Sequence, residues 1–297
     1  TIFGSMGDDT VSGGAGNDFL DGWLGGNDVL MGNDGDDGLI GRGGNDTLVG
    51  GAGNDQLMGS IGDDVFVFNA GDGNDVIFPS DYDDRPDRMS ALSFGTGITP
   101  DDLVLRQVPT GQGNSFIGLP LAYQFVVGFR NSSDSVTIVD MMTYADDPAR
   151  VPLQYFRFAD GTVWNSEEIR SRLLSGTSGD DFLSGTYMSD TISGGAGNDT
   201  LNGYGLNQDT LLGGLGDDVY LVCYGDGADR IEDTDGNDSI VFLGRDSDEV
   251  LPSDVSVSID GKDVLLSIGS YADQPLRLVG AAVEGGSGTI ESVQFTN

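Results

Sequence analysis

The chain has 297 residues, of which 49 are acidic, 13 are Lys or Arg and none is histidine, and its formal net charge at pH 7 is -36. Surfaces that bind nucleic acid need clustered Lys and Arg, so this balance excludes DNA and RNA as partners. The lack of histidine excludes Ser-His-Asp and Cys-His catalysis and the usual zinc sites, and the lack of any apolar run of about 18 residues predicts no membrane span.

Residues 1–78 repeat a nine-residue pattern: Gly, Gly, any, Gly, any, Asp, any, apolar, any. The unit Gly13 to Asp21 (GGAGNDFLD) is a regular example. Glycine accepts the positive φ angles of a tight turn, so that backbone carbonyls can face inward, and the aspartate adds a carboxylate. Calcium takes about 6 to 8 oxygen ligands of these kinds, so we predict calcium sites at the turns. The predicted ligand aspartates of this block are Asp9, Asp18, Asp28, Asp37, Asp46, Asp55, Asp64 and Asp75, and the predicted turn glycines are Gly14, Gly16, Gly35, Gly44, Gly51 and Gly53.

The apolar residue two positions after each aspartate predicts a short strand with one inward side chain. Two nonapeptides then form a coil of 18 residues, which buries its apolar residues by stacking on the next coil. Aspartates on one side of the stack should then recur about every 18 residues. Asp28 and Asp46 are 18 residues apart, and Asp18 and Asp37 are 19 apart. The pattern therefore predicts a parallel β-roll in which each calcium bridges two stacked turns.

Residues 79–175 contain less glycine and more alternating apolar stretches, such as Tyr123 to Val127 and Val136 to Val139. This alternation predicts a small antiparallel β domain. A short helix is expected near 166–174, with Asn165 or Ser166 as its N-cap and acidic residues in its first turn.

Residues 176–241 return to the nine-residue pattern and predict a second parallel β-roll. Some units depart from it: Met188 replaces a fourth-position glycine, which makes the site at Asp190 doubtful, and the loops near Trp23 and Leu206 each carry an inserted residue. We expect this roll to bind calcium more weakly than the first. The predicted ligand aspartates are Asp181, Asp190, Asp199, Asp209, Asp218, Asp229 and Asp238, and the predicted turn glycines are Gly195, Gly197, Gly214 and Gly216.

Residues 242–297 are interpreted as a second, truncated copy of the 79–175 domain. The segment GDDVFVFNAGDGNDVI starting at Gly62 recurs as GDDVYLVCYGDGADRI at Gly216, an offset of 154 residues. The chain is therefore expected to be all-β, with two parallel β-rolls alternating with small antiparallel β domains, and to be part of something longer. Cys223 lies in the repeated segment and is expected to be a buried, inert strand residue.

The repeat units resemble the RTX, or haemolysin-type calcium-binding, repeat. Residues 79–175 resemble the haemolysin-type calcium-binding protein related domain, through ITPDDLVLR (Ile98 to Arg106) and FADGTVW (Phe158 to Trp164). The resemblance implies a chain that leaves a Gram-negative cell unfolded, through a type I secretion channel, and then folds in external calcium. About 6 internal sites are expected in the first roll and 4 or 5 in the second.

Two functions remain open after this comparison. The favoured one is a calcium-binding structural and secretion module of a larger secreted protein, such as a toxin, adhesin, surface-layer protein or enzyme, located outside the cell or on its surface. The alternative is a cell-surface or polysaccharide-binding module, which an exposed aromatic groove on 79–175 would favour. Carboxylate pairs formally allow a glycosidase-like site, but calcium ligation explains them better and no enzymatic activity is expected.

Overall fold

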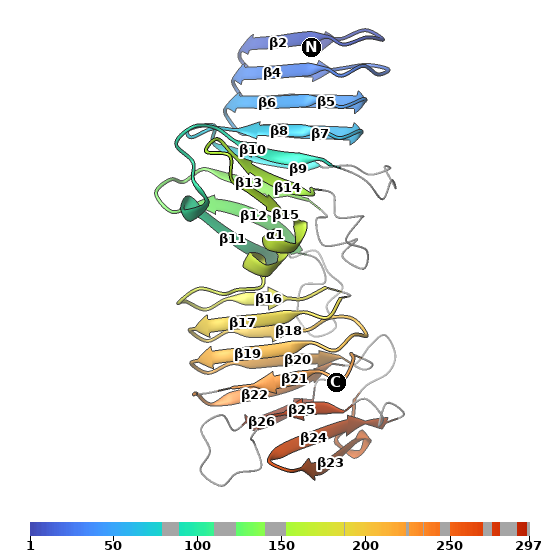
Figure 1. Cartoon of the computed structure of the whole chain (residues 1–297), viewed down its shortest axis with the longest axis vertical. Coiled ribbons are helices and arrows are strands. Elements are labelled where there is room, and N and C mark those ends of the chain that lie inside the picture. Colours follow the sequence, from blue (N-terminus) through green and yellow to red (C-terminus); the bar gives the residue numbers. More distant parts are fainter. Residues whose placement is uncertain are drawn as a thin grey trace. The chain divides into compact units, whose positions relative to one another are not determined.

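The computed structural model describes residues 1–78, 89–109, 123–139, 153–186, 188–223, 226–233, 235–243, 250–269, 275–279 and 290–295. These residues fall into two compact units, one ending at Arg170 and the other beginning at Ser171. Strands dominate both units (Figure 1). In the described residues, no helix has the length and hydrophobicity needed to cross a membrane.

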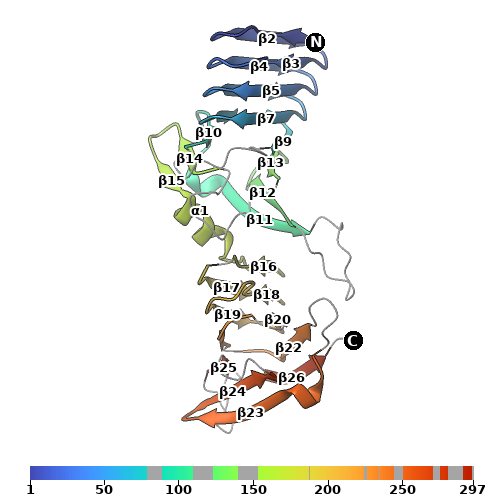
Figure 2. The same ribbon diagram turned by 90° about the vertical axis from the view of Figure 1, so that its right-hand side faces the viewer.

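The first unit is built on two sheets between which the chain alternates, so that consecutive nonapeptides form one coil of a parallel β-roll (Figures 1 and 2). One sheet has the order β1 (Ile2–Phe3), β3 (Phe19–Asp21), β5 (Gly38–Gly43), β7 (Gln56–Ile61), β9 (Asn74–Phe78), β13 (Ser135–Ile138), β12 (Tyr123–Phe129), β11 (Leu103–Pro109). The other has the order β15 (Val163–Asn165), β14 (Tyr155–Phe158), β10 (Ala91–Phe94), β8 (Val65–Phe68), β6 (Thr47–Ala52), β4 (Val29–Asp34), β2 (Thr10–Ala15). The predicted roll is confirmed.

The apolar position of the repeat forms the core of this roll, as predicted. Stacked strands place these side chains in register, for example Leu30 beside Leu48 and Leu48 beside Phe66. Each is at most 8% exposed, which removes apolar area from water in every coil. The buried residues are Val11, Leu20, Leu30, Leu39, Leu48, Leu57, Phe66 and Ile77.

The segment after the first roll is less antiparallel than predicted. Strands β10 and β14 continue one sheet of the roll in parallel, and β13 pairs in parallel with β9. Among the described strands of the first unit, antiparallel pairing occurs only between β11, β12 and β13, and between β14 and β15. The roll ends in two sheet edges, at β8 and β9, whose backbone groups need partners. Strand β10 pairs with β8 and strand β13 pairs with β9.

The predicted helix is confirmed as α1 (Ser166–Leu173). Asn165 is its N-cap, because the Asn165 side-chain oxygen accepts the backbone N–H of Glu168 at 2.9 Å. Ile169 and Leu173 form the buried face of the helix.

The second unit repeats this design with fewer coils. One sheet has the order β16 (Phe182–Ser184), β18 (Thr200–Asn202), β20 (Val219–Cys223), β22 (Asp238–Leu243), β26 (Ile290–Phe295). The other has the order β17 (Thr191–Ala196), β19 (Thr210–Leu215), β21 (Arg230–Glu232), β25 (Leu276–Leu278), β24 (Asp263–Ile268), β23 (Val255–Asp260). Cys223 lies on β20 as expected, but it is partly exposed rather than buried, because it is the last residue of the strand.

The two units end in the same topology. The order β9, β13, β12, β11 of the first unit corresponds to β21, β25, β24, β23 of the second, and β8, β10, β14 corresponds to β20, β22, β26. A short 3₁₀ helix precedes the edge strand in both, η1 (Pro100–Asp102) before β11 and η3 (Pro252–Asp254) before β23. Trp23 and Leu206, in the two loops that carry an inserted residue, are exposed, so each insertion is accommodated toward solvent.

Candidate metal centre

The turns of the rolls have left-handed backbone at the pattern glycines. At Gly44 φ is 118°, and an added Cβ would lie 1.9 Å from the carbonyl oxygen of Gly26, so both conformation and space require glycine there. The second position of the pattern keeps a positive φ even at Asn33, Arg42 and Ser60, so the fold imposes this turn on those residues. All predicted turn glycines have positive φ: Gly14, Gly16, Gly35, Gly44, Gly51, Gly53, Gly195, Gly197, Gly214 and Gly216.

The pattern aspartates of the first unit are joined from coil to coil by hydrogen bonds. The Oδ1 atom of Asp46 accepts the backbone N–H of Asp28 at 2.8 Å, and the N–H of Asp46 is donated to Oδ1 of Asp64 at 3.0 Å. One row of such bonds runs through Asp9, Asp28, Asp46 and Asp64, and a second runs through Asp18, Asp37, Asp55 and Asp75. The structure thus brings together the residues that the spacing of about 18 paired.

The second unit has the same two rows. The Oδ1 atom of Asp218 accepts the N–H of Asp199 at 2.8 Å, and Oδ1 of Asp229 accepts the N–H of Asp209 at 3.0 Å. One row contains Asp181, Asp199, Asp218 and Asp238, and the other contains Asp190, Asp209 and Asp229.

The second carboxylate oxygen, Oδ2, is buried in most of these rows. In eight of the aspartates this atom is shielded from solvent and has no hydrogen-bond partner: Asp28, Asp37, Asp46, Asp55, Asp75, Asp199, Asp218 and Asp238. A buried, unsatisfied carboxylate oxygen costs several kcal/mol unless a cation compensates it. A regular series of such atoms is therefore the property expected of metal ligands.

The surroundings of these oxygen atoms fit calcium. A Cβ added to Gly32 would lie 2.2 Å from Oδ2 of Asp37 and 2.5 Å from the carbonyl oxygen of Gly50 in the next coil, so both oxygens face the same small space. Carboxylate and carbonyl oxygens are the ligands that calcium prefers. Asp37 and its equivalents, with the glycine carbonyls of the adjacent turns, would hold the ions.

Three predicted ligands are already engaged by neighbouring side chains. The Oδ2 atom of Asp190 accepts the N–H of Thr186 at 2.7 Å and its hydroxyl at 2.8 Å, and Asp9 and Asp181 accept the same pair of bonds from Ser5 and Thr177. In each of these turns a Ser or Thr stands four residues before the aspartate and lacks the positive φ that Ser60 has at the same position before Asp64. These turns differ from the regular sites, and of the three the sequence marked only the one at Asp190 as irregular.

Three residues that contact the aspartate rows or their ligand oxygens were not among the predicted calcium ligands. Ser90 Oγ accepts the N–H of Asp64 at 3.1 Å, and Glu291 Oε2 accepts the N–H of Asp238 at 2.7 Å, so these two side chains continue one row of each unit. Both lie outside the repeats, and the sequence contained no signal for them. The third, Asp233, occupies a first-position glycine in the irregular unit DTDGND, and that departure was a usable signal.

Burial changes the acidity of the aspartates in these rows. Desolvation raises the pKa of Asp46 and Asp55 to about 6, and that of Asp75 and Asp209 to about 8. If the chain were folded without calcium at neutral pH, Asp75 and Asp209 would hold protons that calcium must displace.

Calcium-free protein is expected to lose structure as the pH rises from about 4 to 8. A carboxylate whose folded pKa is raised stabilises the folded chain fully below the unfolded value of 3.8, and this stability is lost as the pH passes the folded pKa, about 8 for Asp75. Circular dichroism in chelator across this range measures the effect. Asp75→Asn should flatten the upper part of the curve and the exposed Asp101→Asn should not; equal structure at pH 4 and pH 8 would contradict the expectation.

Comparison with known families agrees with this geometry. The family model described as RTX calcium-binding nonapeptide repeat (4 copies) matches residues 1–25, 24–48, 31–66, 40–77, 175–207, 190–220 and 224–241. The model described as haemolysin-type calcium binding protein related domain matches residues 125–168, which include FADGTVW but not ITPDDLVLR.

A search of curated proteins finds no match. Among solved structures, the chain is similar to the extracellular lipase LipA from Serratia marcescens, with 19% sequence identity and a TM-score of 0.29. The alignment covers 89% of this chain and 40% of the lipase, so the chain spans well under half of that protein's length. By its two sets of family matches, the chain carries two blocks of RTX calcium-binding nonapeptide repeats with a haemolysin-type calcium binding protein related domain between them.

Proposed function

We propose that this chain is a calcium-dependent structural and secretion module of a larger, type I-secreted bacterial RTX protein, and that it performs no catalytic step itself. It is unfolded in the cytosol, where calcium is scarce, and folds outside the cell, where calcium is abundant. The observation that carries this proposal is the repeated burial of aspartate Oδ2 atoms without hydrogen-bond partners.

The energetics favour coupling between folding and calcium binding. The chain carries a formal charge of -36, and its rows place carboxylates in successive coils within hydrogen-bonding distance of one another's backbone. Without cations, burial of these groups opposes the gain from the narrow apolar core, so the extended chain is favoured. Calcium neutralises the carboxylates and adds its binding free energy to folding.

This coupling suits secretion. A chain that stays extended at low calcium can pass through a narrow channel, and folding in external calcium then opposes its return. The affinity expected for extracellular calcium modules, on the order of 10⁻⁴ to 10⁻³ M, leaves the sites empty in the cytosol. Secretion machinery and external calcium are accordingly the proposed partners.

Calcium added to chelated protein is expected to produce one cooperative transition from coil to β structure, with about ten ions bound. Circular dichroism and calorimetric titration measure both quantities, and magnesium serves as the control because it dehydrates reluctantly and demands octahedral geometry. A chain that is already folded in chelator and binds only one or two ions would contradict the proposal.

The alternative, a polysaccharide- or surface-binding module, has less support. In the described part of residues 79–175, the aromatic side chains are buried or half-buried: Phe94, Phe125, Phe129, Tyr155, Phe156, Phe158 and Trp164. Several stack on one another, as Phe94 does on Phe158, so they serve the core. The exposed aromatic groove that would favour this alternative is not formed by these residues.

A further inference from the structure

The turn between β21 and β22 is chemically different from the regular turns. In regular turns the space beside a first-position glycine is shared by an aspartate Oδ2 and the carbonyl of the first-position glycine one coil later, as at Gly194, where Gly213 supplies the carbonyl. Beside Gly213 the nearest neighbour of an added Cβ is the hydroxyl oxygen of Tyr220, followed by Asp218 Oδ2 at 2.3 Å and Asp233 Oδ2 at 2.5 Å. Here a tyrosine hydroxyl and a second carboxylate oxygen lie close by, where the regular turn has a glycine carbonyl oxygen.

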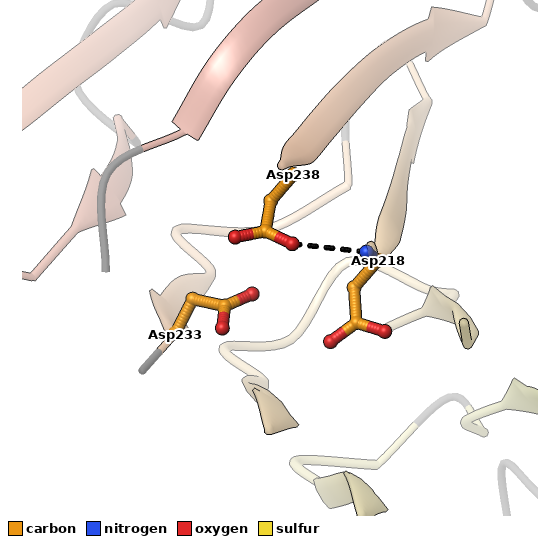
Figure 3. Close-up of side chains that lie close together, drawn as sticks. All are labelled: Asp218, Asp233 and Asp238. Atoms are coloured by element: carbon orange, nitrogen blue, oxygen red, sulfur yellow. Dashed lines mark hydrogen bonds between the residues drawn. The ribbon is translucent and has the colours of Figure 1, made fainter. Parts of the chain in front are cut away.

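This replacement creates a compact group of three buried carboxylates. Asp218, Asp233 and Asp238 are 0%, 8% and 1% exposed, and each offers one oxygen within 4.8 Å of the others'. Figure 3 shows the three side chains close together, from successive passes of the chain: just before β20, just after β21 and at the start of β22. The Oδ2 atoms of Asp218 and Asp238 are shielded from solvent and have no hydrogen-bond partner.

A buried tyrosine orients the additional carboxylate. The hydroxyl of Tyr220 donates a hydrogen bond to Oδ2 of Asp233. Tyr220 occupies the apolar position of its repeat and is fully buried, whereas the equivalent position of the first roll, 154 residues earlier, holds Phe66. The second unit therefore has both the extra carboxylate and the hydroxyl that positions it.

We propose that Asp218, Asp233 and Asp238 form a calcium site of their own type, whose third carboxylate comes from outside the repeat pattern, and that it binds calcium more tightly than the regular turns. This deepens the proposed function, on which it rests, by naming the site of the second roll that fills first. More carboxylate ligands raise the affinity of an oxygen site for calcium. Because the ion would join β20, β21 and β22, it would order this end of the roll before the weaker sites fill.

Asp233→Asn in the full chain tests the site, with Asp235→Asn as the matched control, because Asp235 is an exposed acid in the same turn. Calcium titration against a competing chelator should show, for wild type and Asp235→Asn, one ion bound at about tenfold lower free calcium than the rest. Asp233→Asn should lose that tight step while the remaining ions still bind. Identical curves for all three proteins would overturn the proposal.

Tyr220→Phe provides a second test that keeps all three carboxylates and copies Phe66 of the first roll. Loss of the orienting hydrogen bond should weaken the tight step by about 10-fold or more. Terbium, which replaces calcium and is excited by a nearby tyrosine, should lose part of its sensitised emission in this variant. If Asp233→Asn does not fold, this variant decides: an unchanged tight step and unchanged emission would overturn the proposal.

Failure of this site and failure of the proposed function give different results. If the chain does not act as a calcium-folded module, wild type itself gains no β structure in calcium. If only the three-carboxylate site is wrong, wild type folds in calcium and the tight step is absent or insensitive to Asp233→Asn.

Discussion

Gly44→Ala is expected to abolish calcium-dependent folding of the first roll, whereas Gly43→Ala leaves it intact. Gly44 has a φ of 118°, and its added Cβ would lie 1.9 Å from the carbonyl oxygen of Gly26. The Cβ of alanine at Gly43 meets nothing within 4 Å. Left-handed strain and the backbone clash together cost about 2 to 6 kcal/mol, a large part of the stability of a small domain.

The measurement is a calcium titration followed by circular dichroism, performed on wild type and the two adjacent variants. Gly44→Ala should need much higher calcium for the transition, or show none in the first roll, and should bind several ions fewer. The same transition in Gly44→Ala and Gly43→Ala would mean that the close stacking of the turns is not required for calcium-dependent folding.

Asp46→Asn and Asp46→Ala are expected to separate the two roles of a pattern aspartate. Oδ1 of Asp46 accepts the N–H of Asp28, while Oδ2 is buried without a hydrogen-bond partner. Asparagine keeps the acceptor and removes the charge, so it should lose at least one bound calcium. Alanine also leaves the N–H of Asp28 unsatisfied, which should cost about 1 to 3 kcal/mol more.

Calcium stoichiometry and urea unfolding in saturating calcium measure the two effects. Asp36→Asn is the control, because Asp36 is exposed and its Oδ1 bond to the N–H of Asn54, 3.0 Å long, is preserved in asparagine. If Asp46→Asn binds as many ions as the control, the buried Oδ2 is not a ligand; if Asn and Ala are equally stable, the bond between coils adds nothing.

The regular part of the roll could be predicted from sequence because each coil makes the same contacts as the next. Leu30, Leu48 and Phe66 are buried in register, and the bonds between Asp28, Asp46 and Asp64 recur at steps of 18 residues. A period of 18 thus encodes both the stacking and the carboxylate rows. The prediction of an antiparallel domain at residues 79–175 was less accurate. Alternating apolar residues predict a half-buried strand, but they indicate neither its direction nor its partner.

The ends of the rolls required the tertiary structure. Ser90 and Glu291 meet the rows across 26 and 53 residues, and no periodicity encodes a contact of that kind. Tyr220 and Asp233 could be read only as departures from the pattern, and the fold shows that they touch.

The sequence by itself therefore determined the parallel rolls, their apolar core, the turn glycines and the aspartate rows, because these depend on contacts between neighbouring, nearly identical coils. The tertiary structure decided how strands β10, β13 and β14 extend the sheets, how the rows end and where three carboxylates converge. Those features depend on single long-range pairings, whose register is set by packing at the sheet edges and not by any repeated spacing in the chain.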